Sequence, residues 1–422
     1  MKRASRSIRS RQAVAYDYCI IGGGVAGTTA AETLRQRDAG ATIAVVSDEP
    51  HRFYSRILLS KPNFFLGKIP FDQIWLKTLQ WYRELKIDLL AGQRATAVDA
   101  AAHTVTLDGK KTLRYRKLLI ATGAQAVPWP ADGADKKGVL YLRTLDDAKQ
   151  IIAAIKKAKR AVCVGSGFTS FEMCEMLTMA GLQVTLVMRE PHYWDPLLDE
   201  QSGKMIEAAL LSGGVKIHRN ALVKTVDGRA KVSGVTLESG QNIPCEVIVA
   251  GVGAQPDLSW LQGSTVKTNR GILADEYLKT SAPDVYTAGD CAEFNDLILD
   301  EHVLLGNWVN AQMHGKLAAA NMLGERQPFK LVSFYTAMGF GLTIAFAGDV
   351  RSQGRQVITR GPQGNTFARL IVDEHDELVG ATFINRTNEL ASVCKLIEKN
   401  VKVSPIKDKL ADPTVDLGTL AR

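Results

Sequence analysis

Residues 16–27 read Tyr-Asp-Tyr-Cys-Ile-Ile-Gly-Gly-Gly-Val-Ala-Gly. We predict a buried strand over Tyr16–Ile21, a turn of the form Gly-x-Gly-x-x-Gly over Gly22–Gly27, a helix over Thr28–Arg37 and a second strand over Thr42–Val46. Glycines at this spacing allow a tight turn, close approach of a ligand to the backbone and close packing of the helix on the strand. The unpaired N–H groups at the start of the helix favour a phosphate group. This stretch therefore predicts a dinucleotide-binding βαβ unit.

The same order of elements recurs in the second third of the chain. A strand is predicted over Ala161–Val164, a second glycine turn over Gly165–Ser170, a helix over Phe171–Ala180 and a strand over Gln183–Val187. Ser170 replaces the third glycine, and serine is small enough to keep the helix close to the strand. Two such units predict two dinucleotide sites in an α/β fold with two doubly wound domains.

The last quarter of the chain has a different pattern. After strands expected at Glu246–Gly251 and Asp284–Thr287 and a helix at Asn310–Met322, short β-rich runs and a helix near Glu389–Asn400 predict a smaller α+β C-terminal domain. The predicted organisation is a basic flexible arm over 1–13, a discontinuous first domain over 14–126 and 247–326, a second domain over 127–246 and a third over 327–422.

The net charge of +8 is concentrated in the N-terminal arm, which carries five of its cations before any acid appears. The mild positive balance of the remaining chain fits an acidic protein partner and gives little reason to expect nucleic acid. The arm lacks the apolar core of a secretory signal. The longest uncharged run, Leu331–Gly348, is too polar for a membrane helix, so no membrane span is expected.

Six cysteines form no close pair in the sequence, and seven histidines show no ligand spacing. These patterns argue against a metal site and against a redox-active dithiol formed by cysteines close in sequence. They favour a reducing compartment, so we expect the protein in the cytoplasm.

Several residues are candidates for the first dinucleotide site. Gly22, Gly24, Ala26 and Gly27 are expected at the pyrophosphate, and either Asp48 or Glu49 at a ribose, because an acid should follow the second strand. Two more strands end in small or acidic residues, in the segments Ala121-Thr122-Gly123 and Gly289-Asp290. Residues at the carboxyl ends of such strands face the ligand crevice, where Asp290 can accept hydrogen bonds from a sugar-like chain.

With these motifs the chain resembles the FAD-dependent pyridine nucleotide-disulphide oxidoreductase superfamily over about residues 14–325. Residues 47–61, Ser-Asp-Glu-Pro-His-Arg-Phe-Tyr-Ser-Arg-Ile-Leu-Leu-Ser-Lys, are similar to the ferredoxin and rubredoxin reductase branch, including the flavoprotein modules of nitrite reductases. No cysteine lies between Glu49 and Gly92, so the chain lacks the CxxxxC pair of the disulphide reductases. Over the C-terminal domain the resemblance is loose: only Ser333-Phe334-Tyr335-Thr336 represents the Trp-rich segment of that branch.

The resemblance implies that Arg56, Lys61, Thr122 and Gly123 lie at the FAD and that Lys61 pairs with Glu172. A positive charge near the flavin stabilises its reduced, anionic form. Surface ion pairing is the alternative interpretation of these charged residues. Three residues remain: Trp308 is either a core residue or a neighbour of the flavin or the acceptor, and Asn310 and Gln312 are candidate caps of the helix facing the flavin.

The second site is predicted to bind a nicotinamide dinucleotide through Gly165, Gly167, Phe168 and Ser170, and Gly253 belongs to a turn that resembles the family's approach to the nicotinamide. The second strand of this unit ends Val187-Met188-Arg189-Glu190. The planar guanidinium of Arg189 suits a 2′-phosphate, so we expect NADP in preference to NAD. Glu190 keeps NAD open, because its carboxylate could bind the ribose hydroxyls instead.

The predicted function is electron transfer from NAD(P)H through FAD to an external one-electron acceptor, most simply an iron–sulfur protein such as ferredoxin or rubredoxin. One alternative is the flavin subunit of a larger complex such as nitrite reductase. Another is a flavoprotein related to apoptosis-inducing factor, whose redox state controls binding. Homodimers are common in the superfamily, so a dimer and a subunit of a larger complex both remain open.

Overall fold

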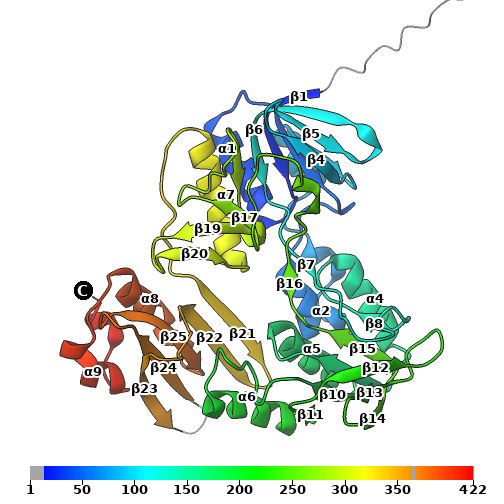
Figure 1. Cartoon of the computed structure of the whole chain (residues 1–422), viewed down its shortest axis with the longest axis vertical. Helices are drawn as coiled ribbons and strands as arrows, with labels where there is room; N and C mark the ends of the chain where they lie inside the picture. The colour runs from blue at the N-terminus through cyan, green and yellow to red at the C-terminus, as the bar shows by residue number, and fades with distance from the viewer. Residues whose placement is uncertain (1–13, 364–365, 422) are drawn as a thin grey trace, which may run out of the picture.

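The computed structural model describes residues 14–363 and 366–421, and the predicted basic arm over 1–13 lies outside them. The chain forms three domains (Figure 1). The first lies at the top of the view, the second at the lower right and the C-terminal domain at the lower left.

A seven-stranded sheet forms the first domain, with the order β3-β2-β1-β6-β5-β4 and with β18 paired to β6. The strands β3, β2, β1, β6 and β18 are parallel. The helices α1 (Val25–Arg37) and α7 (Trp308–Met322) pack together with this sheet around a buried apolar core. The strands are β1 (Val14–Ile21), β2 (Ile43–Ser47), β3 (Ile87–Ala91), β4 (Ala95–Asp99), β5 (Thr104–Leu107), β6 (Thr112–Ile120) and β18 (Val285–Thr287).

The second domain has a five-stranded parallel sheet with the order β11-β10-β9-β15-β8. Its helices are α4 (Leu145–Ile155), α5 (Phe168–Met179) and α6 (Glu200–Ser212). The strands are β8 (Val139–Leu140), β9 (Arg160–Val164), β10 (Gln183–Val187), β11 (Lys216–His218) and β15 (Val247–Ala250), beside a three-stranded antiparallel sheet of β12 (Val223–Asp227), β13 (Gly234–Leu237) and β14 (Asn242–Pro244).

The predicted boundary at residue 247 needs correction. The strand β15 pairs in parallel with β9, so Val247–Ala250 belongs to the second domain and not to the first. The chain returns to the first domain at the two-stranded link between β7 (Gln125–Ala126) and β16 (Ala254–Gln255). A short, fully apolar run can enter either parallel sheet, because its sequence does not specify a partner strand.

A five-stranded antiparallel sheet with the order β21-β22-β25-β24-β23 forms the C-terminal domain. The buried Arg360 pairs with Glu389 and donates to the carbonyls of Leu410 and Val415, which ties the final segment of the chain to the sheet. The elements are β21 (Phe334–Gly339), β22 (Leu342–Gly348), β23 (Gln356–Gln363), β24 (Thr366–Val372), β25 (Leu378–Ile384), α8 (Leu390–Glu398) and α9 (Lys407–Ala411). Within the described part of the chain, no helix has the length and hydropathy of a membrane span.

Candidate active site

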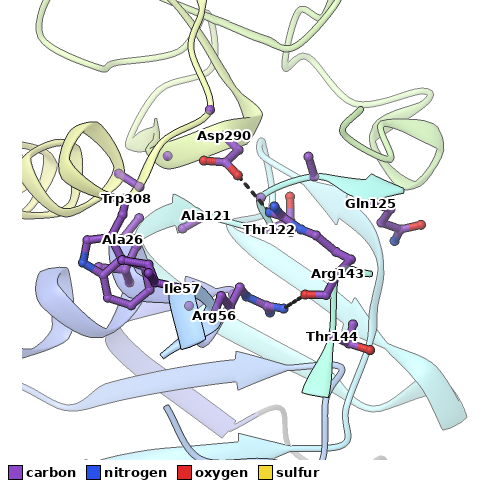
Figure 2. Close-up of a pocket in the computed structure, with 18 of the residues that line it drawn as sticks. Ala26, Arg56, Ile57, Ala121, Thr122, Gln125, Arg143, Thr144, Asp290 and Trp308 are labelled. Carbon is purple, nitrogen blue, oxygen red and sulfur yellow. Dashed lines mark hydrogen bonds and ion pairs between the residues drawn. The ribbon is translucent and has the colours of Figure 1, made fainter. Parts of the chain in front are cut away.

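A cavity of about 1110 Å³ lies where the three domains meet, and Figure 2 shows part of its wall. The first glycine loop, the segment from His51 to Lys61, the start of α5 and the strand β21 all contribute to it. The predicted site residues on this wall are Gly22, Gly24, Ala26, Asp48, Glu49, Arg56, Lys61, Thr122, Gly123, Phe168, Glu172, Asp290 and Trp308.

Six other predicted residues do not line this cavity: Gly27, Gly165, Gly167, Ser170, Arg189 and Gly253. Gly27 lies behind the first loop, against the Gly22 carbonyl. Three of the others form the second glycine loop, Arg189 follows β10, and Gly253 precedes β16. The cavity and the second loop are therefore neighbouring sites that share the start of α5, where Phe168 and Glu172 face the cavity.

The first glycine loop has the geometry that phosphate binding requires. Gly22 has φ +121°, and a Cβ there would lie 2.0 Å from the Ala121 carbonyl oxygen, so only glycine fits. A Cβ on Gly27 would lie 1.9 Å from the Gly22 oxygen. Gly24 precedes the first residue of α1, makes no side-chain cap and has open space at its Cβ position. The first N–H groups of α1 are thus accessible to an anion.

The second glycine loop repeats this geometry, but Ser170 stands where the first loop has its third glycine. Gly165 has φ +102°, and a Cβ there would lie 2.4 Å from the Gly251 oxygen. Gly167 precedes α5 without a side-chain cap and has open space at its Cβ position. The buried Ser170 hydroxyl donates to the Val164 carbonyl, 3.2 Å away, and a Cβ on Gly251 would lie 2.5 Å from that hydroxyl. Ser170 can therefore replace a glycine because Gly251 provides the space.

A chain of polar side chains crosses the cavity wall. Glu49 forms a close ion pair with Arg56 and accepts a 2.7 Å hydrogen bond from the Tyr54 hydroxyl. Arg56 donates to the Arg143 carbonyl at 2.8 Å, and the Arg143 guanidinium pairs with Asp290 at 2.8 Å (Figure 2). Burial raises the pKa of Tyr54, so its hydroxyl keeps the proton that it donates. Glu49, and not the exposed Asp48, is the acid tied into this network.

Sequence analysis missed Arg143. A local signal was present, because Thr144 and Asp147 form a capping box at the start of α4, a pattern that marks a helix N-terminus in sequence. That signal would have placed Arg143 just before a helix. Only the tertiary structure brings it to Asp290, which lies 147 positions further along the chain.

Lys61 and Glu172 form a close ion pair between the first and second domains, and Ser60 also donates to Glu172. Both charged side chains are mostly buried, with 27% and 15% exposure, so they are not a pair on the outer surface. The expected pairing is present, and its role beside a flavin remains a prediction.

The start of α7 differs from the prediction. Asn307 caps this helix by accepting from the Asn310 amide N–H at 2.8 Å, whereas Asn310 and Gln312 were the expected caps. A cap must precede the first turn with an extended backbone, and Asn310 already lies inside that turn. Trp308 is not a core residue: its ring lines the cavity and stacks on Phe53 with 5.8 Å between ring centroids.

After β10, the two candidate specificity residues have different environments. The side chain of Arg189 is 78% exposed, and its Nε donates to Glu190 Oε1 at 2.9 Å. Glu190 is only 15% exposed, and its Oε2 is buried without a hydrogen-bond partner among the described residues. The inner position after this strand is therefore occupied by a carboxylate, with the guanidinium outside it.

Family models match both parts of the chain. Residues 16–315 match the model described as pyridine nucleotide-disulphide oxidoreductase, and residues 339–421 match the reductase C-terminal model. The chain is 30% identical over 386 residues to the biphenyl dioxygenase system ferredoxin–NAD(+) reductase component of Paraburkholderia xenovorans (strain LB400), which covers 91% of this chain and 94% of that protein. It is 28% identical to nitrite reductase [NAD(P)H] of Bacillus subtilis (strain 168), covering 91% of this chain and 47% of that protein.

Solved structures give the same result. The ferredoxin reductase for the CYP199A2 system from Rhodopseudomonas palustris has a TM-score of 0.89 and 26% identity, covering 96% of this chain and all of that one. Putidaredoxin reductase in its covalent complex with putidaredoxin also has a TM-score of 0.89, with 25% identity and 95% of this chain covered. The resemblance inferred from the motifs and the predicted fold class are confirmed. The chain is an oxidoreductase that belongs to the pyridine nucleotide-disulphide oxidoreductase family.

Proposed function

We propose that the protein passes electrons from NADH, through FAD, to an iron–sulfur protein such as a ferredoxin. The observation that carries this proposal is the pair of matched glycine loops, each at an uncapped helix start with open space before it. The helix that follows the second loop also lines the cavity of the first. Two dinucleotides bound at these loops would meet in one cavity, as transfer between them requires.

The residues of the first site fit FAD. The first loop offers N–H groups for the pyrophosphate, Glu49 stands where a ribose would bind, and Asp290 with Arg143 lies at the carboxyl ends of the central strands. A bound FAD would supply the conversion from two-electron donor to one-electron acceptor that the reaction needs. Lys61 would place a positive charge beside it, and Glu172 and Ser60 hold that lysine in position.

The geometry after β10 favours NADH over NADPH. The sequence favoured NADP and kept NAD as the alternative. The carboxylate of Glu190, which keeps 15% exposure at the strand end where an acid binds ribose hydroxyls, would repel a 2′-phosphate. Arg189 is already bonded to that carboxylate and points to solvent. The relative from Paraburkholderia xenovorans is itself named for NAD(+).

The relatives support the proposed partner, and the free cysteines support the proposed location. Several relatives are named ferredoxin reductase components of dioxygenase systems, which supports a ferredoxin-like partner. A flavin subunit of a larger complex is the second candidate, favoured by the nitrite reductase of which this chain spans 47%. All six cysteines are free thiols, which is consistent with a cytoplasmic location.

Anaerobic stopped-flow mixing of the yellow protein with NADH or NADPH tests the proposal. We expect NADH to bleach the visible absorbance of the flavin much faster than NADPH, and a ferredoxin to restore it. Glu190→Gln should narrow the difference between the two donors. Equal rates for both donors in the wild type would refute the role of Glu190, and no bleaching by either would refute the function.

A further inference from the structure

Tyr193 lies in the segment between β10 and α6, and its side chain is fully buried. Its hydroxyl donates a 2.9 Å hydrogen bond to the carbonyl oxygen of Gly167, the residue that precedes α5 in the second glycine loop. Burial raises the pKa of Tyr193, so the hydroxyl remains a donor. Neither the predicted site residues nor the cavity wall includes this tyrosine.

The tyrosine is itself firmly held. Its backbone N–H donates to Glu207 Oε1 at 2.9 Å, and Glu207 is a buried residue of α6. The other oxygen of Glu207 accepts from Arg219 Nε at 2.6 Å. A continuous set of hydrogen bonds therefore connects the glycine loop to α6 and to the end of β11. The backbone of Tyr193 is anchored to α6, and its ring is held by burial.

This bond, together with the first helical bond of α5, holds the direction of one backbone donor. The peptide bond between Gly167 and Phe168 is trans, so its C=O and N–H point in opposite directions. The carbonyl accepts from both Tyr193 and the Phe171 N–H, which is 3.1 Å away. The Phe168 N–H therefore points away from Tyr193 and from the body of α5, and the Cβ position of the neighbouring Gly167 is open. A hydrogen-bonded carbonyl also makes the N–H of its peptide a better donor.

We infer that Tyr193 is a positioning residue for the nicotinamide cofactor: it fixes the Gly167–Phe168 peptide so that the Phe168 N–H binds the pyrophosphate. This inference rests on the proposed function and adds Tyr193 to the residues that would support cofactor binding at the second loop. Within residues 14–363 and 366–421, no side chain donates to the carbonyl of Gly24, the matching residue of the first loop. Of the two loops, only the second therefore has its peptide held by a side-chain hydrogen bond.

Tyr193→Phe tests the inference, because it removes only the hydroxyl. We expect the NADH concentration for half-maximal bleaching rate to rise roughly three- to tenfold, the worth of the hydrogen bond from the Phe168 N–H to the pyrophosphate, with an unchanged limiting rate. Reduced nicotinamide mononucleotide, which has no pyrophosphate, should be unaffected. Tyr286→Phe is the matched control: that buried hydroxyl donates to the Asn321 carbonyl at 3.2 Å in the first domain, so NADH dependence should not change.

A second pair of variants tests the donor and does not depend on the stability of Tyr193→Phe. Phe168→Pro removes the N–H, and Phe168→Ala removes the same ring but keeps the N–H. Proline is well tolerated at the first position of a helix, and the extended backbone of Gly167 (φ −94°, ψ −177°) suits a residue before proline. The proline variant should bind NADH more weakly than the alanine variant.

The results expected for the variants and for the wild type distinguish failure of the inference from failure of the proposed function. Wild-type NADH dependence in Tyr193→Phe, an equal shift with the mononucleotide, or equal NADH binding by the two Phe168 variants would overturn the inference and leave the function intact. A wild-type protein that NADH does not bleach would overturn both.

Discussion

The close contact between Ser170 and Gly251 leads to a prediction about the stability of the second glycine loop. In Gly251→Ala, the new methyl group would lie 2.5 Å from the Ser170 hydroxyl oxygen, well inside van der Waals contact. Gly251 does not have a left-handed φ, so alanine brings no backbone strain there. Any destabilisation must therefore come from the contact with Ser170.

The magnitude follows from the two ways of relieving this contact. Either the loop moves, at the cost of about 1–3 kcal/mol that overpacking of a core typically causes, or Ser170 rotates. Rotation would break its hydrogen bond to Val164 and leave a buried hydroxyl without a partner, which also costs about 1–3 kcal/mol. For a domain of this size, 1 kcal/mol lowers the Tm by about 4 °C. We expect Gly251→Ala to lower the Tm of the second domain by about 4–12 °C.

The decisive variant is the double mutant with Ser170→Gly. Ser170→Gly alone should cost about 1–2 kcal/mol through the lost hydrogen bond and the flexibility of glycine. If the steric contact is the cause, adding Ser170→Gly to Gly251→Ala brings the stability back to that of Ser170→Gly alone, and the coupling energy is about 1–3 kcal/mol. Thermal unfolding followed by circular dichroism measures all four proteins, with Gly40→Ala as control because a Cβ there meets nothing. A double mutant whose losses simply add would refute the reasoning.

Three further predictions concern other parts of the molecule. Gly24→Ala should leave the apoprotein as stable as wild type, because its Cβ position is empty, and should lower the amount of bound FAD, measured by absorbance; full FAD content would contradict the phosphate cradle. Lys61→Met should slow bleaching by NADH at least roughly tenfold at unchanged FAD content, because it removes the cation that we propose beside the flavin and breaks the ion pair of Glu172, whereas an unchanged rate would make the pair purely structural. Burial opposes ionisation of Glu389, but hydrogen bonds from Arg360 and a second arginine outweigh it and hold the pKa of Glu389 below its ordinary value. Its stabilisation is therefore complete above about pH 4.3 and lost as the pH falls through the lowered pKa. The free energy of unfolding of Glu389→Gln should lie below that of the wild type at neutral pH, and this difference should shrink as the pH falls below that value. A difference that stays constant with pH would show that ionisation of Glu389 does not contribute to stability.

Local sequence patterns were sufficient for the two βαβ units. Each combines a strand, a glycine loop and a helix within some thirty residues, so the spacing alone identified Gly22 and Gly165. The atoms that require glycine there belong to Ala121 and Gly251, which follow strands distant in sequence. The change to an α+β C-terminal domain was also visible, because short β-rich runs replaced the βαβ order; the antiparallel order of its sheet came from the structure. The assignment of β15 to the wrong domain shows the limit of this reasoning, since strand partners are selected by contacts distant in sequence.

The candidate site was less predictable, because several of its contacts cross between domains. Glycines and acids at strand ends were found from the motifs, whereas Arg143 reaches Asp290 only in the folded chain. The two residues proposed to govern cofactor choice also differ in a way that only burial reveals. Arg189 and Glu190 are adjacent in sequence, and only the structure distinguishes an exposed guanidinium from a carboxylate that faces inward.

The helix α5 explains why the three domains could not be assembled from sequence. A helix that is apolar on nearly all sides is normally buried, and the acids of α5 then need partners from elsewhere. Glu172 finds Lys61 of the first domain, and Glu175 accepts a 2.6 Å hydrogen bond from the Phe340 N–H of the C-terminal domain. At the start of the helix, the Phe168 ring stacks on Tyr335 of the same domain with 5.8 Å between centroids. Two acids on an otherwise apolar helix are therefore a sign, readable in sequence, that other domains cover it, although they do not identify which ones.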